Sequence, residues 1–159
     1  MKVAVLKETS ANESRVGLVP DGVKFLKKKG LEAVVEKGAG LAAGFPDAAY
    51  EAEGASIAPD ASAAASGADF VFKVQPPTVD EVGTLSKGQI LLSSLQPVMN
   101  LELVKALRDA GITTMAMDLM PRITRAQSMD ILSSQATVAG YKAVLLGANA
   151  IGKFLPMLT

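Results

Sequence analysis

Short apolar runs alternate with helix-like patterns along most of this chain. The runs are rich in Val, Ile and Leu, as in KVAVL at residues 2–6, which is typical of strands buried on both faces of a sheet. The segments between them carry apolar residues at helical spacing, and several begin at Pro or stop at Gly. The predicted strands are residues 2–6, 32–36, 55–58, 69–74, 89–92 and 112–117, and the predicted helices begin near residues 20, 46, 61, 79 and 101.

This alternation predicts an α/β fold, with a parallel sheet covered by helices on both faces. The expected architecture is a Rossmann-like, doubly wound sheet formed by residues 1–125. Ligands of such sheets bind beyond the carboxyl ends of the strands, and the loop after residue 117 starts from one of those ends.

The last part of the chain has a different pattern. A long helical segment runs from about Arg125 to Phe154, and Pro156 should end or bend it. Its apolar residues have no following element to pack against. It is either a terminal helix that folds back on the sheet or a connector to a second domain. The second interpretation is favoured, so residues 126–159 are expected to form a long connecting helix that leads to a missing domain.

Composition limits the chemistry that the chain can perform. The 159 residues contain no Cys, which excludes disulfides and thiolate metal sites. They also contain no His, which is the commonest acid–base residue and the commonest metal ligand. No metal site is therefore expected. Sixteen basic residues balance sixteen acidic ones, so nothing favours nucleic acid as a partner. No apolar run approaches the roughly 20 residues of a membrane span, and the N-terminus lacks a signal-peptide pattern, which favours a cytoplasmic location.

The segment MPRITRAQSMDILSSQATVAGY, residues 120–141, concentrates polar side chains where a helix should begin. Part of this has an ordinary explanation, because Thr124 and Gln127 match a capping box and Asp130 would complement the helix dipole. These roles leave Arg122 unexplained, and they leave unexplained why Gln127, Asp130 and Ser133 recur every three positions. On one helix, that spacing keeps the three side chains within about a third of the circumference. A binding strip for an oxygen-rich ligand is the alternative.

Other candidate sites are weaker. The turn GAGLAAG, residues 38–44, has the spacing GxGxxxG and is followed by Phe-Pro-Asp rather than a helix, so we interpret it as a flexible turn and not as a dinucleotide loop. Glu13 and Arg15 form a charged pair in a predicted loop, where Arg15 is either solvated or salt-bridged, or else part of a binding site. Lys73, near the end of a predicted strand, either faces a cleft or extends along an edge to solvent.

The segment PRITRAQSMDILSSQATVAGYKAV resembles the signature of the NAD(H)-binding alpha subunit of proton-translocating nicotinamide nucleotide transhydrogenases. LKETSANESRVGLVPDGVKFL, VVEKGAGLAAGFPDAAYEAEGA and ADFVFKVQPP are similar to other parts of that family in the same order. The resemblance covers essentially the whole chain. The family continues beyond this chain into a second Rossmann domain, which holds the NAD phosphates and adenosine.

The resemblance implies specific roles for four residues. Arg122, Gln127, Asp130 and Ser133 would contact the nicotinamide carboxamide and ribose of NAD(H), and Gln127 and Asp130 would act in catalysis by orienting the ring. NADP(H) would be bound by a separate subunit or domain. The implied partners are a second copy of the chain, as a homodimer, and the membrane and NADP-binding subunits. The protein would lie in the cytoplasm, attached to the membrane through those subunits, and the fragment alone would be inactive.

Two other functions stay open. Alanine dehydrogenases are similar relatives, in which Arg15 and Lys73 match substrate-carboxylate positions. They place a catalytic His in the segment that aligns with Ser93-Leu95-Gln96, and this chain has none. Oxidative deamination needs a proton-handling group, whereas direct hydride transfer between two nicotinamides does not. The third possibility is a non-catalytic module that dimerises through its last helix.

Overall fold

The computed structural model describes residues 1–154 and divides into two compact units, Met1–Leu119 and Met120–Thr159. Residue 125, where we expected the first domain to end, falls inside the second unit.

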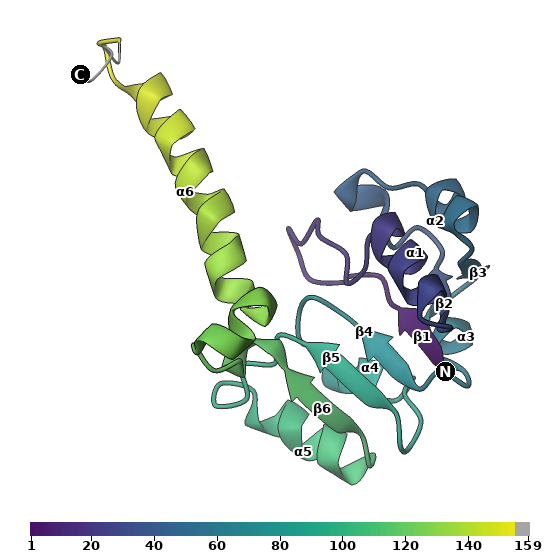
Figure 1. The fold of residues 1–159 in the computed structure, drawn as a ribbon. Helices are drawn as coiled ribbons and strands as arrows, with labels where there is room; N and C mark the ends of the chain where they lie inside the picture. The colour runs from purple at the N-terminus through teal and green to yellow at the C-terminus, as the bar shows by residue number, and fades with distance from the viewer. Residues whose placement is uncertain (155–159) are drawn as a thin grey trace. The chain divides into compact units, whose positions relative to one another are not determined.

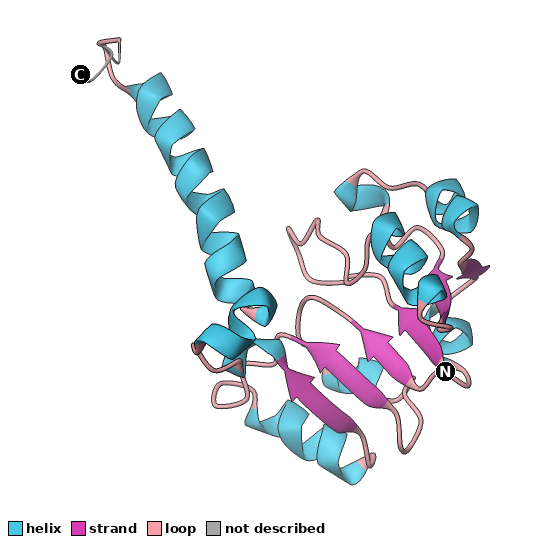
Figure 2. Cartoon of the chain, in the orientation of Figure 1, coloured by secondary structure: helices cyan, strands magenta, loops and turns pink. Residues whose placement is uncertain are grey.

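The first unit is built on one parallel sheet of six strands (Figure 1). The strands are β1 (Lys2–Val5), β2 (Glu32–Glu36), β3 (Ser56–Ala58), β4 (Phe70–Phe72), β5 (Ile90–Ser93) and β6 (Thr113–Ala116). Their order across the sheet is β3-β2-β1-β4-β5-β6, all neighbouring pairs are parallel, and Figure 2 draws the strands in magenta. Each predicted strand is present, although β4 ends at Phe72 and leaves Lys73 beyond it. The parallel sheet predicted from the sequence is confirmed.

Five α-helices follow the strands of this unit. They are α1 (Pro20–Lys28), α2 (Asp47–Glu53), α3 (Ala61–Ala65), α4 (Val79–Val82) and α5 (Leu101–Asp109). Local chemistry sets several of the boundaries. Pro20 occupies the first turn of α1, Asp60 caps α3 by accepting from the amide of Ala63, and Thr78 and Glu81 form a reciprocal capping box on α4.

Helices cover both faces of the sheet, which makes the fold doubly wound. One apolar cluster contains Val5, Val35 and Tyr50 and is shared with α1 and α2. The other contains Ala4, Val71 and Leu107 and is shared with α3, α4 and α5. Neighbouring residues of β1 therefore point into different clusters, as the two-residue period of a strand requires. The predicted Rossmann-like α/β class is confirmed.

The strand order places a switch point between β1 and β4. The chain proceeds from β1 outward to β2 and β3, then returns to the other side of β1 and continues outward from β4 to β6. The crossovers on the two sides of this point leave in opposite directions. Beyond the carboxyl ends of β1 and β4 the connecting loops diverge, and this is where such folds hold ligands.

The second unit contains a 3₁₀ helix, Thr124–Met129, followed by α6, Ile131–Ala150. The prediction of one helix from residue 125 to Phe154 was therefore wrong at both ends. Asp130 has an extended backbone with ψ 97° and separates the two helices, and Ile151 is extended after the last turn of α6. Pro156 and the rest of the predicted segment after Phe154 lie outside the described residues.

Helix α6 has an unusual surface for a helix of 20 residues. None of its residues is buried, and Lys142 is its single charged residue. Apolar side chains such as Tyr141 and Val144 are exposed, at 72% and 65%. Among the described residues, no helix combines the length and the apolar character needed to cross a membrane.

Candidate functional site

Asp130 organises the polar segment at the start of α6. Its Oδ1 accepts hydrogen bonds from the backbone amides of Leu132 at 2.9 Å and Ser133 at 3.1 Å, and its Oδ2 accepts from the Ser133 hydroxyl at 2.7 Å. Asp130 is thus the N-cap of α6. These hydrogen bonds, first of all the one from the Ser133 hydroxyl, lower the pKa of the Asp130 carboxyl, and the charge of Arg122 lowers it further. The carboxylate is held ionised and in a fixed orientation.

The four predicted site residues are therefore not equivalent in the structure. Asp130 and Ser133 are in direct contact, and Arg122 is near enough for its charge to act on Asp130. Gln127 lies on the 3₁₀ helix, is exposed, and makes no side-chain hydrogen bond within the described residues. Its amide is available to a ligand.

Two expectations about this segment were wrong. Thr124 and Gln127 form no capping box, because the 3₁₀ helix starts after Ile123 without a side-chain cap and α6 is capped by Asp130. Gln127, Asp130 and Ser133 do not form a strip on one helix either. They belong to a 3₁₀ helix, a cap and an α-helix in turn, so a spacing of three residues does not place them on a common face.

The first unit carries a second group of polar residues, at the carboxyl ends of its strands. Glu8, in the loop after β1, accepts hydrogen bonds from the backbone amides of Val74 at 2.6 Å and Gln75 at 3.2 Å, just beyond β4. Paired backbone amides at a switch point are where a doubly wound fold would bind an anion. Here a carboxylate of the chain itself occupies that position.

A similar arrangement follows β5. The Asp118 carboxylate accepts from the backbone amides of Leu95 at 2.6 Å and Gln96 at 2.9 Å. Gln96 has φ +46°, a left-handed conformation that is uncommon for a residue other than glycine. Asp118 therefore stabilises a strained turn after β5, and such strain is often found at functional positions.

Lys73 is buried and paired rather than extended to solvent. Its Nζ lies 2.8 Å from Oε1 of Glu81, and its side chain is 1% exposed. The same oxygen of Glu81 accepts from the Thr9 hydroxyl, and the other accepts from the Thr78 amide. Burial alone would raise the pKa of Glu81. The hydrogen bond from Lys73 and the other contacts lower it by more, so the pKa of Glu81 is lowered overall. β4 is an interior strand, so the edge-lysine interpretation was wrong.

Arg15 is also paired with a carboxylate. Its Nε and Nη2 donate to the two oxygens of Glu13 at 2.8 and 2.6 Å, and Gln75 Nε2 donates to Glu13 at 2.7 Å. The hydrogen bond from Arg15 is the main reason that the pKa of Glu13 is lowered to about 2. Both candidate cations of this edge are thus neutralised within the chain. A carboxylate substrate would have to compete with Glu13 and Glu81.

The glycine-rich turn does not form a dinucleotide-binding loop. Residues 41–43 form a short 3₁₀ helix rather than the start of an α-helix that follows β2 directly. Gly40 packs so closely against Tyr50 that a Cβ would lie 2.5 Å from the ring. Close packing and a positive φ of +74° at Gly38 account for the glycines.

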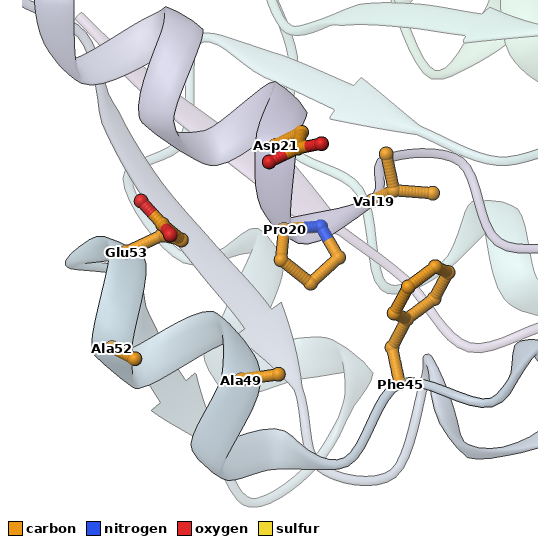
Figure 3. A pocket seen from close by; sticks show the side chains of 7 residues that line it. All are labelled: Val19, Pro20, Asp21, Phe45, Ala49, Ala52 and Glu53. Atoms are coloured by element: carbon orange, nitrogen blue, oxygen red, sulfur yellow. The ribbon is translucent and has the colours of Figure 1, made fainter.

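Two cavities of the first unit adjoin these elements and differ in charge. One, of about 220 Å³, is lined by Lys7, Glu8, Glu13 and Arg15 as well as the glycine-rich turn, so its charges cancel. The other, of about 380 Å³, lies between α1 and α2 (Figure 3). Its lining is apolar except for the carboxylates of Asp21 and Glu53, which would repel phosphate.

Sequence reasoning missed three residues that fix the strand-end loops, namely Glu8, Glu81 and Asp118, whereas the charged pair of Glu13 and Arg15 was noted and is present. A signal was available for Glu8 and Asp118, since each comes within two residues of the end of a predicted strand. Within residues 1–154, no cluster of carboxylates is placed to hold a metal ion.

Comparison with known proteins adds to this geometry. The family model "Alanine dehydrogenase/PNT, N-terminal domain" matches residues 4–139. The chain is 44% identical to NAD(P) transhydrogenase subunit alpha of Cereibacter sphaeroides, with 97% of this chain and 29% of that protein covered. It is 36% identical to alanine dehydrogenase of Bacillus subtilis, over 96% of this chain and 39% of that one.

Solved structures agree with these matches. The transhydrogenase from Sinorhizobium meliloti superposes with a TM-score of 0.92 and 44% identity, covering 99% of this chain and 47% of that one. The chain thus spans less than half the length of these relatives. The match covers both the doubly wound unit and the polar segment capped by Asp130, and the chain belongs to the alanine dehydrogenase and pyridine nucleotide transhydrogenase family, of which it represents the N-terminal domain.

Proposed function

We propose that this chain is the N-terminal domain of the NAD(H)-binding component of a proton-translocating transhydrogenase, and that residues 122–133 position the nicotinamide for hydride transfer from NADH to NADP⁺. The observation that carries this proposal is the Asp130 cap, in a chain that matches transhydrogenase alpha subunits over nearly its full length. A carboxylate fixed by three hydrogen bonds can accept from a carboxamide or a ribose hydroxyl without rearranging.

The chemistry that this segment would perform is orientation. Asp130 offers an acceptor, Gln127 an amide with both donor and acceptor, and Arg122 a cation, while Ser133 holds the carboxylate in place. Hydride transfer needs the two rings at a defined distance and angle, and it needs no proton donor or acceptor from the protein. A chain without histidine can therefore support it.

The proposal includes partners. NADP(H) would be bound by a separate subunit or domain, a homodimer would form, and the assembly would be attached to the cytoplasmic membrane through other subunits. The remaining length of the relatives would hold the rest of NAD(H), so the isolated chain would be inactive. Exposed apolar residues of α6, such as Val144 and Leu146, provide a surface for packing against further polypeptide.

The alanine-dehydrogenase alternative has less support. It would use Arg15 and Lys73 to bind a substrate carboxylate, and both are ion-paired to Glu13 and Glu81. Pyruvate at millimolar concentration should therefore leave amide hydrogen exchange around Lys73 unchanged. Protection of these amides by pyruvate would favour the dehydrogenase function.

The test of the proposed function uses the chain joined to the second domain of a relative and supplied with the NADP-binding partner. Gln127→Asn should slow hydride transfer by about 10- to 100-fold, because a small displacement of the ring is costly. NADH affinity should change much less. Asp130→Asn should behave similarly, and the fold should persist because Asn also caps helices well.

The matched control is Gln135→Ala, which removes an exposed amide one turn into α6. It should leave the rate of hydride transfer unchanged. If Gln127→Asn and Asp130→Asn both turn over like the parent protein, the assigned roles are wrong.

A further inference from the structure

A third cavity, larger than the two above, lies within the first unit and is separate from residues 122–133. It has a volume of about 650 Å³ and opens between the loop after β4 and the loop after β5, next to the first residues of α4 and α5. The two loops contribute Gln75 and Gln96 to its lining, and Asn100 adds a third amide side chain.

The backbone of both glutamines is fixed by a carboxylate from another loop. Glu8 holds the amides of Val74 and Gln75, and Asp118 holds those of Leu95 and Gln96. Two side chains of the same type therefore project from two rigid turns at the ends of neighbouring strands. Preorganised polar groups of this kind are typical of binding sites.

The amide groups retain hydrogen-bonding capacity. Gln75 Nε2 donates to Glu13, but within the described residues no donor reaches its Oε1. The Gln96 amide has no partner among the same residues. Asn100 donates to the carbonyls of Leu95 and Gln96, which leaves its Oδ1 to accept. The cavity thus offers free acceptors from Gln75 and Asn100, and both a donor and an acceptor from Gln96.

The lining carries no cation. Its single charged residue is Glu102, whose side chain is 81% exposed and pairs with Lys105 at 2.9 Å. The lining also includes the hydroxyl residues Ser10 and Thr78 and apolar side chains such as Pro77, Val98 and Met99. A carboxylate or phosphate would find no counter-ion in this cavity, whereas an uncharged ring would find apolar contacts.

We infer that this cavity binds an uncharged, planar ligand that carries a carboxamide, and that Gln75 and Gln96 form hydrogen bonds with its amide group. This site goes beyond the proposed function, because none of its residues lies in the segment 122–133. The ligand's NH₂ donates to the free acceptors, its carbonyl accepts from the Gln96 amide, and its ring contacts Val98 and Met99.

The experiment titrates the 159-residue chain with nicotinamide and, separately, with nicotinate, its carboxylate analogue, and follows backbone amide NMR shifts. Nicotinamide should shift the amides of residues 75–79 and 96–103 with a dissociation constant on the order of 10 mM, as expected for so small a ligand. Nicotinate at the same concentration should bind at least several-fold more weakly. Equal shifts with both ligands, or no shift in these residues, would overturn the inference.

Variants separate this site from the segment 122–133. Gln96→Gly removes the side chain and suits the positive φ, so it should weaken binding by on the order of 10-fold with the fold intact. Gln75→Leu should act similarly, and Gln135→Ala should have no effect. Shifts confined to residues 122–133 would refute this cavity and leave the proposed function standing. Shifts in the cavity that survive Gln96→Gly and Gln75→Leu would also refute the assignment.

Discussion

Lys73 and Glu81 form an ion pair in which the amine is buried and the carboxylate is not. Nζ lies 2.8 Å from Oε1, and the two side chains are 1% and 23% exposed. Glu81 has further partners in Thr9 and Thr78, whereas every hydrogen bond of the Lys73 amine within the described residues goes to Glu81. The amine therefore depends on Glu81 more than Glu81 depends on the amine.

This asymmetry predicts unequal effects of breaking the pair. Glu81→Gln leaves a buried amine without its counter-charge and should lower the free energy of unfolding by about 3 kcal/mol. Lys73→Met replaces the amine with an apolar side chain of similar length and should cost about 1 kcal/mol, because Glu81 can be hydrated. Urea denaturation at pH 7 measures both. Equal losses would show that the pair is symmetric, and the double variant should lose less than the sum of the two.

The Glu13–Arg15 pair predicts a pH dependence of stability. The pKa of Glu13 falls from 4.5 to about 2 on folding, chiefly through the hydrogen bond from Arg15. The stabilisation is fully present above pH 4.5 and is lost as the pH falls from 4.5 towards 2, because the unfolded state takes up the proton first.

Since Arg15 is 45% exposed, solvent screening limits this contribution to at most about 1 kcal/mol. The free energy of unfolding should be measured between pH 2 and 6, where its fall towards low pH forms the acid limb of the profile. Glu13→Gln should remove the part of this fall that protonation of Glu13 causes. Glu102→Gln is the control, because Glu102 is 81% exposed in an i,i+3 pair and should leave the acid limb almost unchanged. A Glu13→Gln profile parallel to that of the parent chain would contradict the assignment.

The strained turn at Gln96 predicts that stability depends on side-chain shape there. Asn tolerates a positive φ, so Gln96→Asn should leave the free energy of unfolding within about 0.5 kcal/mol of the parent chain. Val is β-branched, and Gln96→Val should cost about 1–2 kcal/mol. Thermal or urea denaturation distinguishes the two. If valine is tolerated as well as asparagine, the turn is able to relax.

The fold could be predicted because strand and helix periods are local. Residues 2–6 and 32–36 are apolar runs flanked by helical segments, and that pattern alone places them in a parallel sheet. The start of α6 could not be predicted in this way. Thr124 and Asp130 are both good capping residues, and the choice between them depends on how the chain folds around them.

The strand-end residues were harder to predict for another reason. Glu8 and Gln75 are far apart in the sequence, and so are Asp118 and Gln96, so each contact exists only after the strands have aligned. In the sequence, these loop carboxylates look like ordinary solvated charges. Only the alignment of the strands, which brings them next to backbone amides, distinguishes them from other surface carboxylates.

Glu8 has a consequence for what can bind at the switch point of the sheet. A carboxylate tethered beside its two amides acts at an effective concentration on the order of millimolar or more, and dilution cannot remove it. A nucleotide phosphate from solution would have to displace this internal competitor before it could reach the crevice. The chain thus has a Rossmann-like topology in which Glu8 fills the position where such folds bind phosphate. The crevice at the carboxyl ends of the strands is then available for uncharged groups.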